Sequence, residues 1–262
     1  MSLVYLSSSN CVLNQILLFF ISLLANALSA FAGGGAGLLQ LPALIFLGLP
    51  FSIALATHKI ASVALGIGAT IRHIRERTLI RYYILVMLIA GLPGVVIGAH
   101  IILFIPGPSA EIALGIMTTS LGIYSILKPN LGHQQYTHHF TPTQHLVGGL
   151  VLFSIGTLNG SLTSGTGLFV TMWLIRWYGM DYKHAVAHTL VLVGLFWNGS
   201  GALTLSLYSE IQWTWLPVLV LGSLLGGYIG AHWSIMKGNR WIKRSYEFIT
   251  ISVGLLLIIN AI

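Results

Sequence analysis

Charged residues are scarce in this chain: Lys, Arg, Asp and Glu together make up 6% of its 262 residues. An ordinary soluble domain has about 25%. Only five residues are acidic. So few charges would not keep a soluble globule of this size apart from its neighbours. The composition therefore excludes a cytosolic enzyme, a secreted disulfide scaffold and a disordered regulator.

Cysteine occurs once, as Cys11, which excludes an internal disulfide and a cysteine-based zinc site. The sequence also lacks a nucleotide-binding motif, so energy from ATP would require a partner subunit. The histidines of the segment 128–145 follow no firm metal-ligand spacing. We therefore expect no cofactor and no metal.

Apolar residues are abundant instead: they make up 56% of the chain, and the mean hydropathy is +0.89. A membrane span needs roughly 20 apolar residues. The sequence therefore predicts an all-α polytopic membrane protein, with the lipid bilayer as its partner. The predicted spans are 12–32, 51–71, 82–105, 110–127, 185–207, 213–235 and 246–262, with a slightly short one at 146–162.

Two apolar arms, 38–49 and 168–177, are too short to cross a bilayer. Each follows a glycine-rich break, 33–37 in the first case and 160–167 in the second. At 1.5 Å per residue, such an arm covers about half of a hydrocarbon core of ~30 Å. We therefore predict a discontinuous or re-entrant helical segment at each break.

The chain contains an internal repeat with an offset of 130 to 132 residues. The matched segments are 35–38 with 165–168, 54–57 with 185–188, 94–100 with 226–232, and Gly122 with Gly254. This steady offset predicts an N-terminal repeat in 1–127, a polar histidine-rich linker in 128–145 and a C-terminal repeat in 146–262.

The basic loops predict that the two repeats are inverted. The loop 72–81 carries four arginines, whereas its counterpart 206–212 carries no basic residue. The loop 237–244 carries four basic residues, whereas its counterpart 106–109 carries none. Basic character thus changes sides between the repeats.

Counting the basic residues decides how the broken segments run. If each segment crossed once, five basic residues would face one side and six the other. If each returns to its starting side, all eleven face one side and only Lys59 lies elsewhere. The positive-inside rule favours the second arrangement. It places both termini outside and the linker in the cytoplasm, and it explains the basic charge without nucleic acid.

The glycine breaks are the best candidates for a binding site. Glycine lets backbone approach a ligand closely, and irregular backbone is tolerated in a membrane only within protein or beside a cavity. A helix that restarts after a break presents a positive dipole end, which attracts anions. The alternative is tight helix packing by small residues. The second break also offers polar side chains, namely Asn159, Ser161, Thr163, Ser164 and Thr166.

Several side chains inside the spans could take part. Lys59 lies about eight residues into its span, where it could balance the charge of an anion. Alternatively, its stem could snorkel to the outer interface. His58 and His188 could carry a coupled proton or form hydrogen bonds between helices. The pair His100 and His232 follows Gly-x-x-x-Gly stretches, which favours helix packing for both.

A family resemblance follows from the first break and the span after it. The residues Gly33-Gly34-Gly35, Pro42-Ala43-Leu44, Gly48-Leu49-Pro50 and Ala54-Leu55-Ala56-Thr57-His58-Lys59 resemble the signature of the sulfite exporter TauE/SafE family of membrane permeases. The segments 165–167 and 185–189 resemble the second repeat of that family. The resemblance implies transport of sulfite or a sulfonate across the bacterial inner membrane.

Together these observations predict a secondary transporter, not an enzyme, that moves a small anion by alternating access, with H⁺ as the expected coupling ion. A homodimer is compatible with the sequence. Two alternatives stay open: a passive anion channel, and an intramembrane serine hydrolase using Ser164 and His188. The predicted substrate-binding residues are Gly33, Gly34, Gly35, Thr57, His58, Lys59, Ser161, Ser164, Gly165 and His188.

Overall fold

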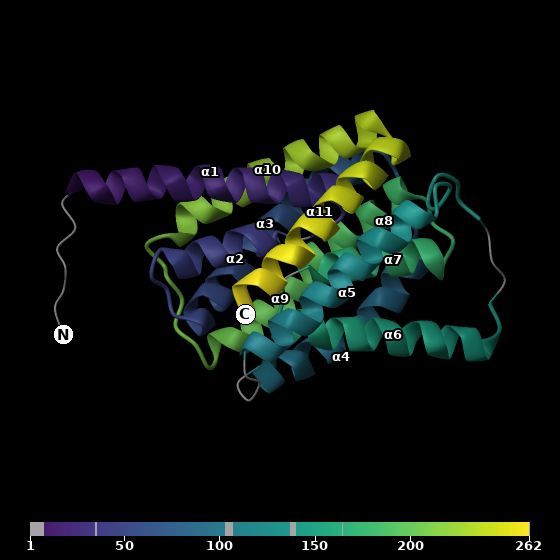
Figure 1. Cartoon of the computed structure of the whole chain (residues 1–262), viewed down its shortest axis with the longest axis horizontal. Coiled ribbons are helices and arrows are strands. Elements are labelled where there is room, and N and C mark those ends of the chain that lie inside the picture. Colours follow the sequence, from purple (N-terminus) through teal and green to yellow (C-terminus); the bar gives the residue numbers. More distant parts are fainter. Residues whose placement is uncertain (1–7, 35, 103–106, 137–139, 164, 262) are drawn as a thin grey trace.

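The computed structural model describes residues 8–34, 36–102, 107–136, 140–163 and 165–261. Every regular element in these ranges is a helix (Figure 1). The elements are α1 (Ser8–Ala32), α2 (Gly37–Phe46), α3 (Phe51–Arg75), α4 (Arg81–Ile101), α5 (Gly107–Leu127), α6 (Pro142–Ser161), α7 (Thr166–Arg176), α8 (Tyr182–Thr189), the π-helix η2 (Leu190–Trp197), α9 (Asn198–Ser206), α10 (Leu216–Lys237) and α11 (Asn239–Ala261).

Among the described residues, five helices are long and apolar enough to cross a membrane, which confirms the predicted all-α membrane protein. They are Leu13–Ala32, Phe51–Arg75, Arg81–Ile101, Tyr182–Ser206 and Leu216–Lys237. Helix α11 begins at Asn239 rather than at Tyr246, where the apolar run begins. The reason is that hydropathy marks the part in lipid, whereas charged residues also fit helical backbone and extend the helix beyond it.

The fourth of these spans contains the π-helical segment η2 in its middle. The sequence pattern gave no sign of this segment. Because a π-helix widens the turn, it changes which side chains face a neighbouring helix, and such segments are frequent at functional sites. Here η2 packs against α3. The backbones come close, because a Cβ placed on Gly66 would lie 2.4 Å from the amide nitrogen of Leu195.

The first short arm returns to the end of the molecule at which α1 begins. Gln15 in α1 bonds to Thr214, and Thr57 near the start of α3 accepts a hydrogen bond from the Gln212 amide. The starts of α1 and α3 therefore meet at the α9–α10 loop. Since α1 leaves this end and α3 begins there, α2 runs back between them.

The second short arm returns in the same way at the opposite end. Tyr82 at the start of α4 contacts His145 at the start of α6. At the end of α7, the Nε of Arg176 donates to the hydroxyl of Tyr124, in the last turn of α5. Helix α7 thus returns to the end that α6 leaves. Both glycine-broken segments are re-entrant in this structure.

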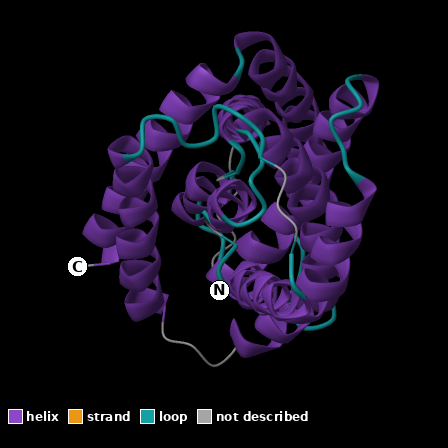
Figure 2. Cartoon of the chain, turned by 90° about the vertical axis from the view of Figure 1, so that its right-hand side faces the viewer, coloured by secondary structure: helices purple, strands orange, loops and turns teal. Residues whose placement is uncertain are grey.

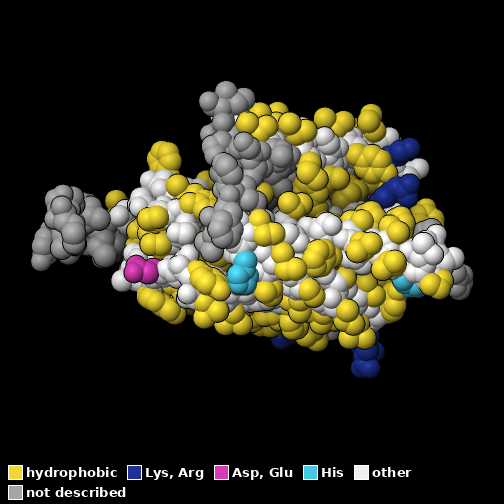
Figure 3. Space-filling view, turned by 90° about the horizontal axis from the view of Figure 1, so that it is seen from below, with side chains coloured by type: hydrophobic (Ala, Val, Ile, Leu, Met, Phe, Trp, Pro, Cys, Tyr) yellow, Lys and Arg dark blue, Asp and Glu magenta, His cyan; other side chains and the backbone are white. Residues whose placement is uncertain are grey.

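The basic loops gather at this second end. The Lys183 side-chain amine lies 4.0 Å from the Glu76 carboxylate. The backbone amide of Lys183 donates to the Asn239 side chain, and the Lys243 amine donates to the Lys128 carbonyl. Figure 2 faces this end and shows loops crossing it. In Figure 3 most visible Lys and Arg side chains lie toward it, while apolar side chains cover the flanks. Basic character therefore marks one end of the bundle.

Each of the two Gly-x-x-x-Gly stretches packs against a helix of the other half of the chain. Helix α4 packs along α6, and α10 packs along α1. A Cβ on Gly98 would lie 2.0 Å from the Thr157 carbonyl oxygen, and one on Gly230 would lie 2.2 Å from that of Ala27. These glycines therefore allow backbone-to-backbone contact, as small residues do in membrane helix pairs.

We expect Gly98→Ala to destabilise the protein by about 1–3 kcal/mol, since the added methyl group meets the α6 backbone and one helix must shift. Gly149→Ala on α6 is the control, because its Cβ would meet nothing closer than Ala90 at 3.7 Å. Unfolding in detergent micelles measures both variants. Equal stability of the two would contradict close packing of α4 on α6.

Candidate functional site

The two glycine breaks are in backbone contact with each other, between the two ends of the bundle. A Cβ on Gly34 would lie 2.6 Å from the carbonyl carbon of Gly167, and a Cβ on Gly167 would lie 3.0 Å from the Cα of Gly34. The backbone that precedes α2 thus touches the first turn of α7. The two breaks therefore meet in the structure.

The backbone at both breaks has conformations that favour glycine. The φ angle is positive at Gly33, Gly34 and Gly165, with values of 91°, 135° and 74°. Residues with a side chain rarely adopt such angles, whereas glycine adopts them readily. Thr163 has φ of 58° and holds this strained conformation through its hydroxyl, which donates to the Asn159 carbonyl. Strain of this kind in a residue other than glycine is concentrated at functional sites.

A small cavity of about 40 Å³ lies at this junction. That space holds about one or two water molecules. None of the described residues that line it is acidic. They come from the ends of α1 and α6, the starts of α2 and α7, and the middle of the spans that follow: Ser29, Gly34, Ala36, Gly37, His58, Ser62, Leu65, Asn159, Thr163, Thr166, Gly167, Thr189, Leu190, Val193, Gly194 and Asn198.

His58 is buried in the cavity wall, and its neighbours fix its tautomer. Ser22 donates to the Leu219 carbonyl, so its oxygen accepts from the amide nitrogen of Gln40 at 2.9 Å. The amide oxygen of Gln40 therefore faces His58 and accepts from Nδ1 at 2.8 Å. Nε2 is left as an acceptor, 3.2 Å from the Ser62 hydroxyl. His58 thus has a proton-accepting nitrogen beside Ser62, and both residues line the cavity.

A matching bond occurs in the second half of the chain. Gln40 and His58 are 18 residues apart, and so are Thr171 and Thr189, whose hydroxyls are 2.9 Å apart. The Thr171 hydroxyl also donates to the carbonyl oxygen of Gly33 at 2.7 Å. Each short arm is therefore tied to the following span by a buried side-chain bond at the cavity.

Lys59 is fully buried, so it does not snorkel to an interface. Its amine donates to the carbonyl oxygen of Asn159 at 2.8 Å, and its stem packs against Gly201, where a Cβ would lie 3.0 Å from Nζ. The carboxylates that form ion pairs in the described part of the chain pair with other residues. Lys59 is not itself in the cavity lining, but it holds Asn159, which is.

Two buried amide oxygens at the cavity have no hydrogen-bond partner: Oδ1 of Asn159 and Oδ1 of Asn198. The amide of Asn159 is oriented by Thr166. The Thr166 hydroxyl donates to the Thr163 carbonyl, so its oxygen accepts from Nδ2 of Asn159. An unpaired buried acceptor costs about 1–3 kcal/mol. The lining therefore offers unpaired hydrogen-bond acceptors.

Of the ten predicted site residues, Gly34 and His58 line the cavity, and Gly35 and Ser164 lie outside the described residues. Gly33 and Gly165 adjoin the cavity through their chain neighbours. Ser161 bonds back to the Thr157 carbonyl of its own helix. The remaining predicted residues that are absent from the lining are Thr57, Lys59 and His188.

Thr57 and His188 make other connections. Thr57 accepts from the α9–α10 loop, as described above. The Nδ1 of His188 donates to the His184 carbonyl, and Nε2 accepts from the Ile80 amide at 2.9 Å. Nδ1 is thus used within α8 and Nε2 holds the α3–α4 loop, so neither nitrogen is free to act as a base for a serine.

Sequence reasoning did not include Ser62, Thr189 or Asn198 among the site residues. Two of them had a usable signal. Ser62 lies one helical turn after His58, on the same face. Thr189 follows the segment 185–188 as His58 follows 54–57. No feature of the sequence indicated Asn198, because its position depends on the π-helical segment before it.

The chain is similar to known proteins over most of its length. The family model described as "Sulfite exporter TauE/SafE" matches residues 18–257. The "Probable membrane transporter protein ORF9" of Sinorhizobium sp is 27% identical over 242 residues, covering 92% of this chain and 91% of that protein. The "Probable membrane transporter protein YfcA" of Escherichia coli (strain K12) is 28% identical over 228 residues, covering 86% and 82%.

A "Probable membrane transporter protein" of Haemophilus influenzae is 29% identical over 227 residues, covering 87% of this chain and 88% of that protein. No solved structure matches the chain. The family match spans both halves of the chain and both glycine breaks. The relatives are named as membrane transporters, and the matches cover 82–91% of their length. The chain therefore belongs to the sulfite exporter TauE/SafE family of membrane transporters.

Proposed function

We propose that this protein is a secondary carrier for a small anion, sulfite or an organosulfonate, which binds where the two glycine breaks meet. The observation that carries the proposal is the contact of Gly34 with Gly167 at a polar cavity. Discontinuous helices that meet between two halves form the binding sites of many secondary transporters.

The charge at the junction supports an anion. Helices α2 and α7 both begin at the cavity, and a helix N-terminus carries a partial positive charge. The buried Lys59 amine lies behind Asn159 and adds positive charge when it is protonated. With no acidic side chain in the cavity lining, a cation would have nothing to compensate it.

The acceptors at the same junction support a proton that travels with the anion. Oδ1 of Asn159 and Oδ1 of Asn198 are acceptors without a partner among the described residues, and Nε2 of His58 is an acceptor beside the Ser62 hydroxyl. A ligand that only accepts hydrogen bonds would leave the two amide oxygens unpaired. An anion that enters with a proton would satisfy both kinds of group.

The cavity supports alternating access rather than an open pore. A sulfonate does not fit into about 40 Å³, so loading requires the short arms to separate. Each arm is joined to its long helix by glycines, which absorb large changes of backbone angle. We propose that the arms part toward one side at a time, with the basic end in the cytoplasm.

Uptake of radiolabelled sulfite into proteoliposomes tests this function. We expect saturable uptake that an inward proton gradient raises, that sulfonates inhibit, and that shows counterflow when unlabelled sulfite is trapped inside. Protein-free liposomes are the control. A channel would give flux without counterflow. No uptake by folded protein under an imposed pH gradient would contradict sulfite as the substrate.

A further inference from the structure

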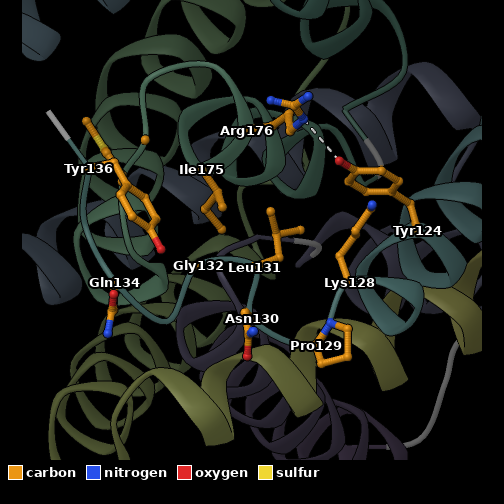
Figure 4. Close-up of a pocket in the computed structure, with 12 residues that line it drawn as sticks. Tyr124, Lys128, Pro129, Asn130, Leu131, Gly132, Gln134, Tyr136, Ile175 and Arg176 are labelled. Atoms are coloured by element: carbon orange, nitrogen blue, oxygen red, sulfur yellow. Dashed lines mark hydrogen bonds between the residues drawn. The ribbon is translucent and has the colours of Figure 1, made fainter. Parts of the chain in front are cut away.

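A second and larger cavity, of about 420 Å³, opens at the basic end of the bundle. It lies between the last turn of α5, the linker and the last turn of α7 (Figure 4). Helix α7 connects it to the glycine junction, but its lining at Arg176 is nine residues from Gly167, or about 14 Å along the helix axis. The two cavities share no lining residue.

The linker forms one wall of this cavity and is pinned in place. The Tyr136 amide donates to the Gly179 carbonyl at 2.7 Å, and the Tyr182 amide donates to the Gly132 carbonyl at 2.9 Å. Gly132 has φ of 68°, and a Cβ there would lie 2.4 Å from the Tyr182 ring. The strap 128–136 is therefore a built wall of the cavity.

The cavity carries two positive charges and no negative one. Lys128 and Arg176 line it, and no lining residue is acidic. The four ion pairs in the described residues involve neither of them. Arg176 donates through Nε to the hydroxyl of Tyr124 at 3.0 Å. That bond orients the guanidinium, and in Figure 4 the Lys128 amine lies on the same side of the cavity, beside Tyr124.

The nearest carboxylate in sequence is already used. Asp181 follows the lining residue Met180, but it caps α8 by accepting from the His184 amide at 2.9 Å and also pairs with Asn239. Burial alone would raise the pKa of Asp181, but the hydrogen bonds from His184 and Asn239 outweigh burial and lower it. This carboxylate is therefore used at the start of α8, and it forms no ion pair with Lys128 or Arg176 among the described residues.

We infer that this cavity binds a phosphate monoester. A phosphate monoester carries a charge of about −1.5 to −2, which two cations match, and guanidinium binds phosphate oxygens through two nitrogens. The volume exceeds that of a bare phosphate, and Leu131, Ile175 and Met180 offer apolar surface to the carbon part of an ester. The ester belongs either to a lipid headgroup or to a soluble metabolite. This inference does not depend on the transported anion.

Two probes with the same headgroup distinguish the sources: soluble glycerol 3-phosphate, and phosphatidic acid in phosphatidylcholine nanodiscs. Binding to the full-length protein is measured by native mass spectrometry and by thermal shift. We expect the double variant Lys128→Gln with Arg176→Gln to bind at least 10-fold more weakly. We expect a smaller loss for Tyr124→Phe, which frees Arg176 without changing charge.

The control is Lys237→Gln with Arg240→Gln, which removes two exposed charges from the same end of the bundle but outside this cavity. It is expected to bind like the wild type. Binding of both probes assigns a soluble phosphate ester, and binding of phosphatidic acid alone assigns a lipid headgroup. Absence of binding to the wild type, or an equal loss in both double variants, would overturn the inference.

Discussion

Replacing Gly34 by alanine is expected to abolish anion flux and to lower the free energy of unfolding by about 2–6 kcal/mol. A methyl group there would lie 2.6 Å from the carbonyl carbon of Gly167, a distance that only a shift of backbone relieves, at about 1–3 kcal/mol. The φ of 135° at Gly34 adds strain of about 1–3 kcal/mol. Because both breaks line the cavity, any such shift also displaces the binding groups.

Gly48→Ala separates strain from contact. Gly48 has φ of 98°, but a Cβ there meets nothing within 4 Å. This variant should lose about 1–3 kcal/mol of stability and keep its flux. Proteoliposome flux and detergent unfolding measure both changes. A fully active Gly34→Ala protein would mean that the junction is not on the path of the anion.

Lys59→Gln is expected to weaken anion binding about 10- to 100-fold while the protein stays folded. Glutamine can still donate to the Asn159 carbonyl, so the change removes charge and little else. At about 6 Å and an effective dielectric constant of ~20, one unit charge contributes about 3 kcal/mol, and about 1.4 kcal/mol corresponds to tenfold in affinity. The measurement is the concentration dependence of sulfite uptake.

The stability of variants at Lys59 gives a second readout. An unpaired buried ammonium is unfavourable, and an apolar side chain of similar volume is often neutral or more stable. Lys59→Met should therefore be at least as stable as the wild type, because the Asn159 carbonyl keeps its bond from Thr163. Exposed Lys237→Gln is the charge control. Normal affinity in Lys59→Gln would remove this residue from anion binding, whereas loss of folding in Lys59→Met would make it a structural residue.

Much of the architecture followed from hydropathy and charge. Predicted spans became helices because in lipid every backbone amide must be paired within the chain. The count of basic residues predicted that the short arms return, and the contacts at Thr57 and Arg176 place the ends of the bundle accordingly. The inversion of the repeats remains a prediction, although the bonds of Gln40 and Thr171 occupy matching positions.

The site was harder to predict than the architecture. A helix in a membrane can turn any face to the cavity, and hydropathy does not say which. His58 and Lys59 are adjacent in sequence, yet one faces the cavity and the other donates to the carbonyl of Asn159 behind it. His188, which matches Thr57 in the repeat, holds the Ile80 amide instead.

The sequence by itself determined that this is an all-α membrane protein with two glycine breaks and one charge-rich end. These features depend on local composition, on the length of apolar runs and on where charges can reach water. Only the tertiary structure decided that Gly34 meets Gly167, that Ser62, Asn159 and Asn198 share a cavity, and that the linker forms a wall beside Arg176. Such contacts join residues that are far apart in the sequence, and they depend on how each helix is rotated and packed.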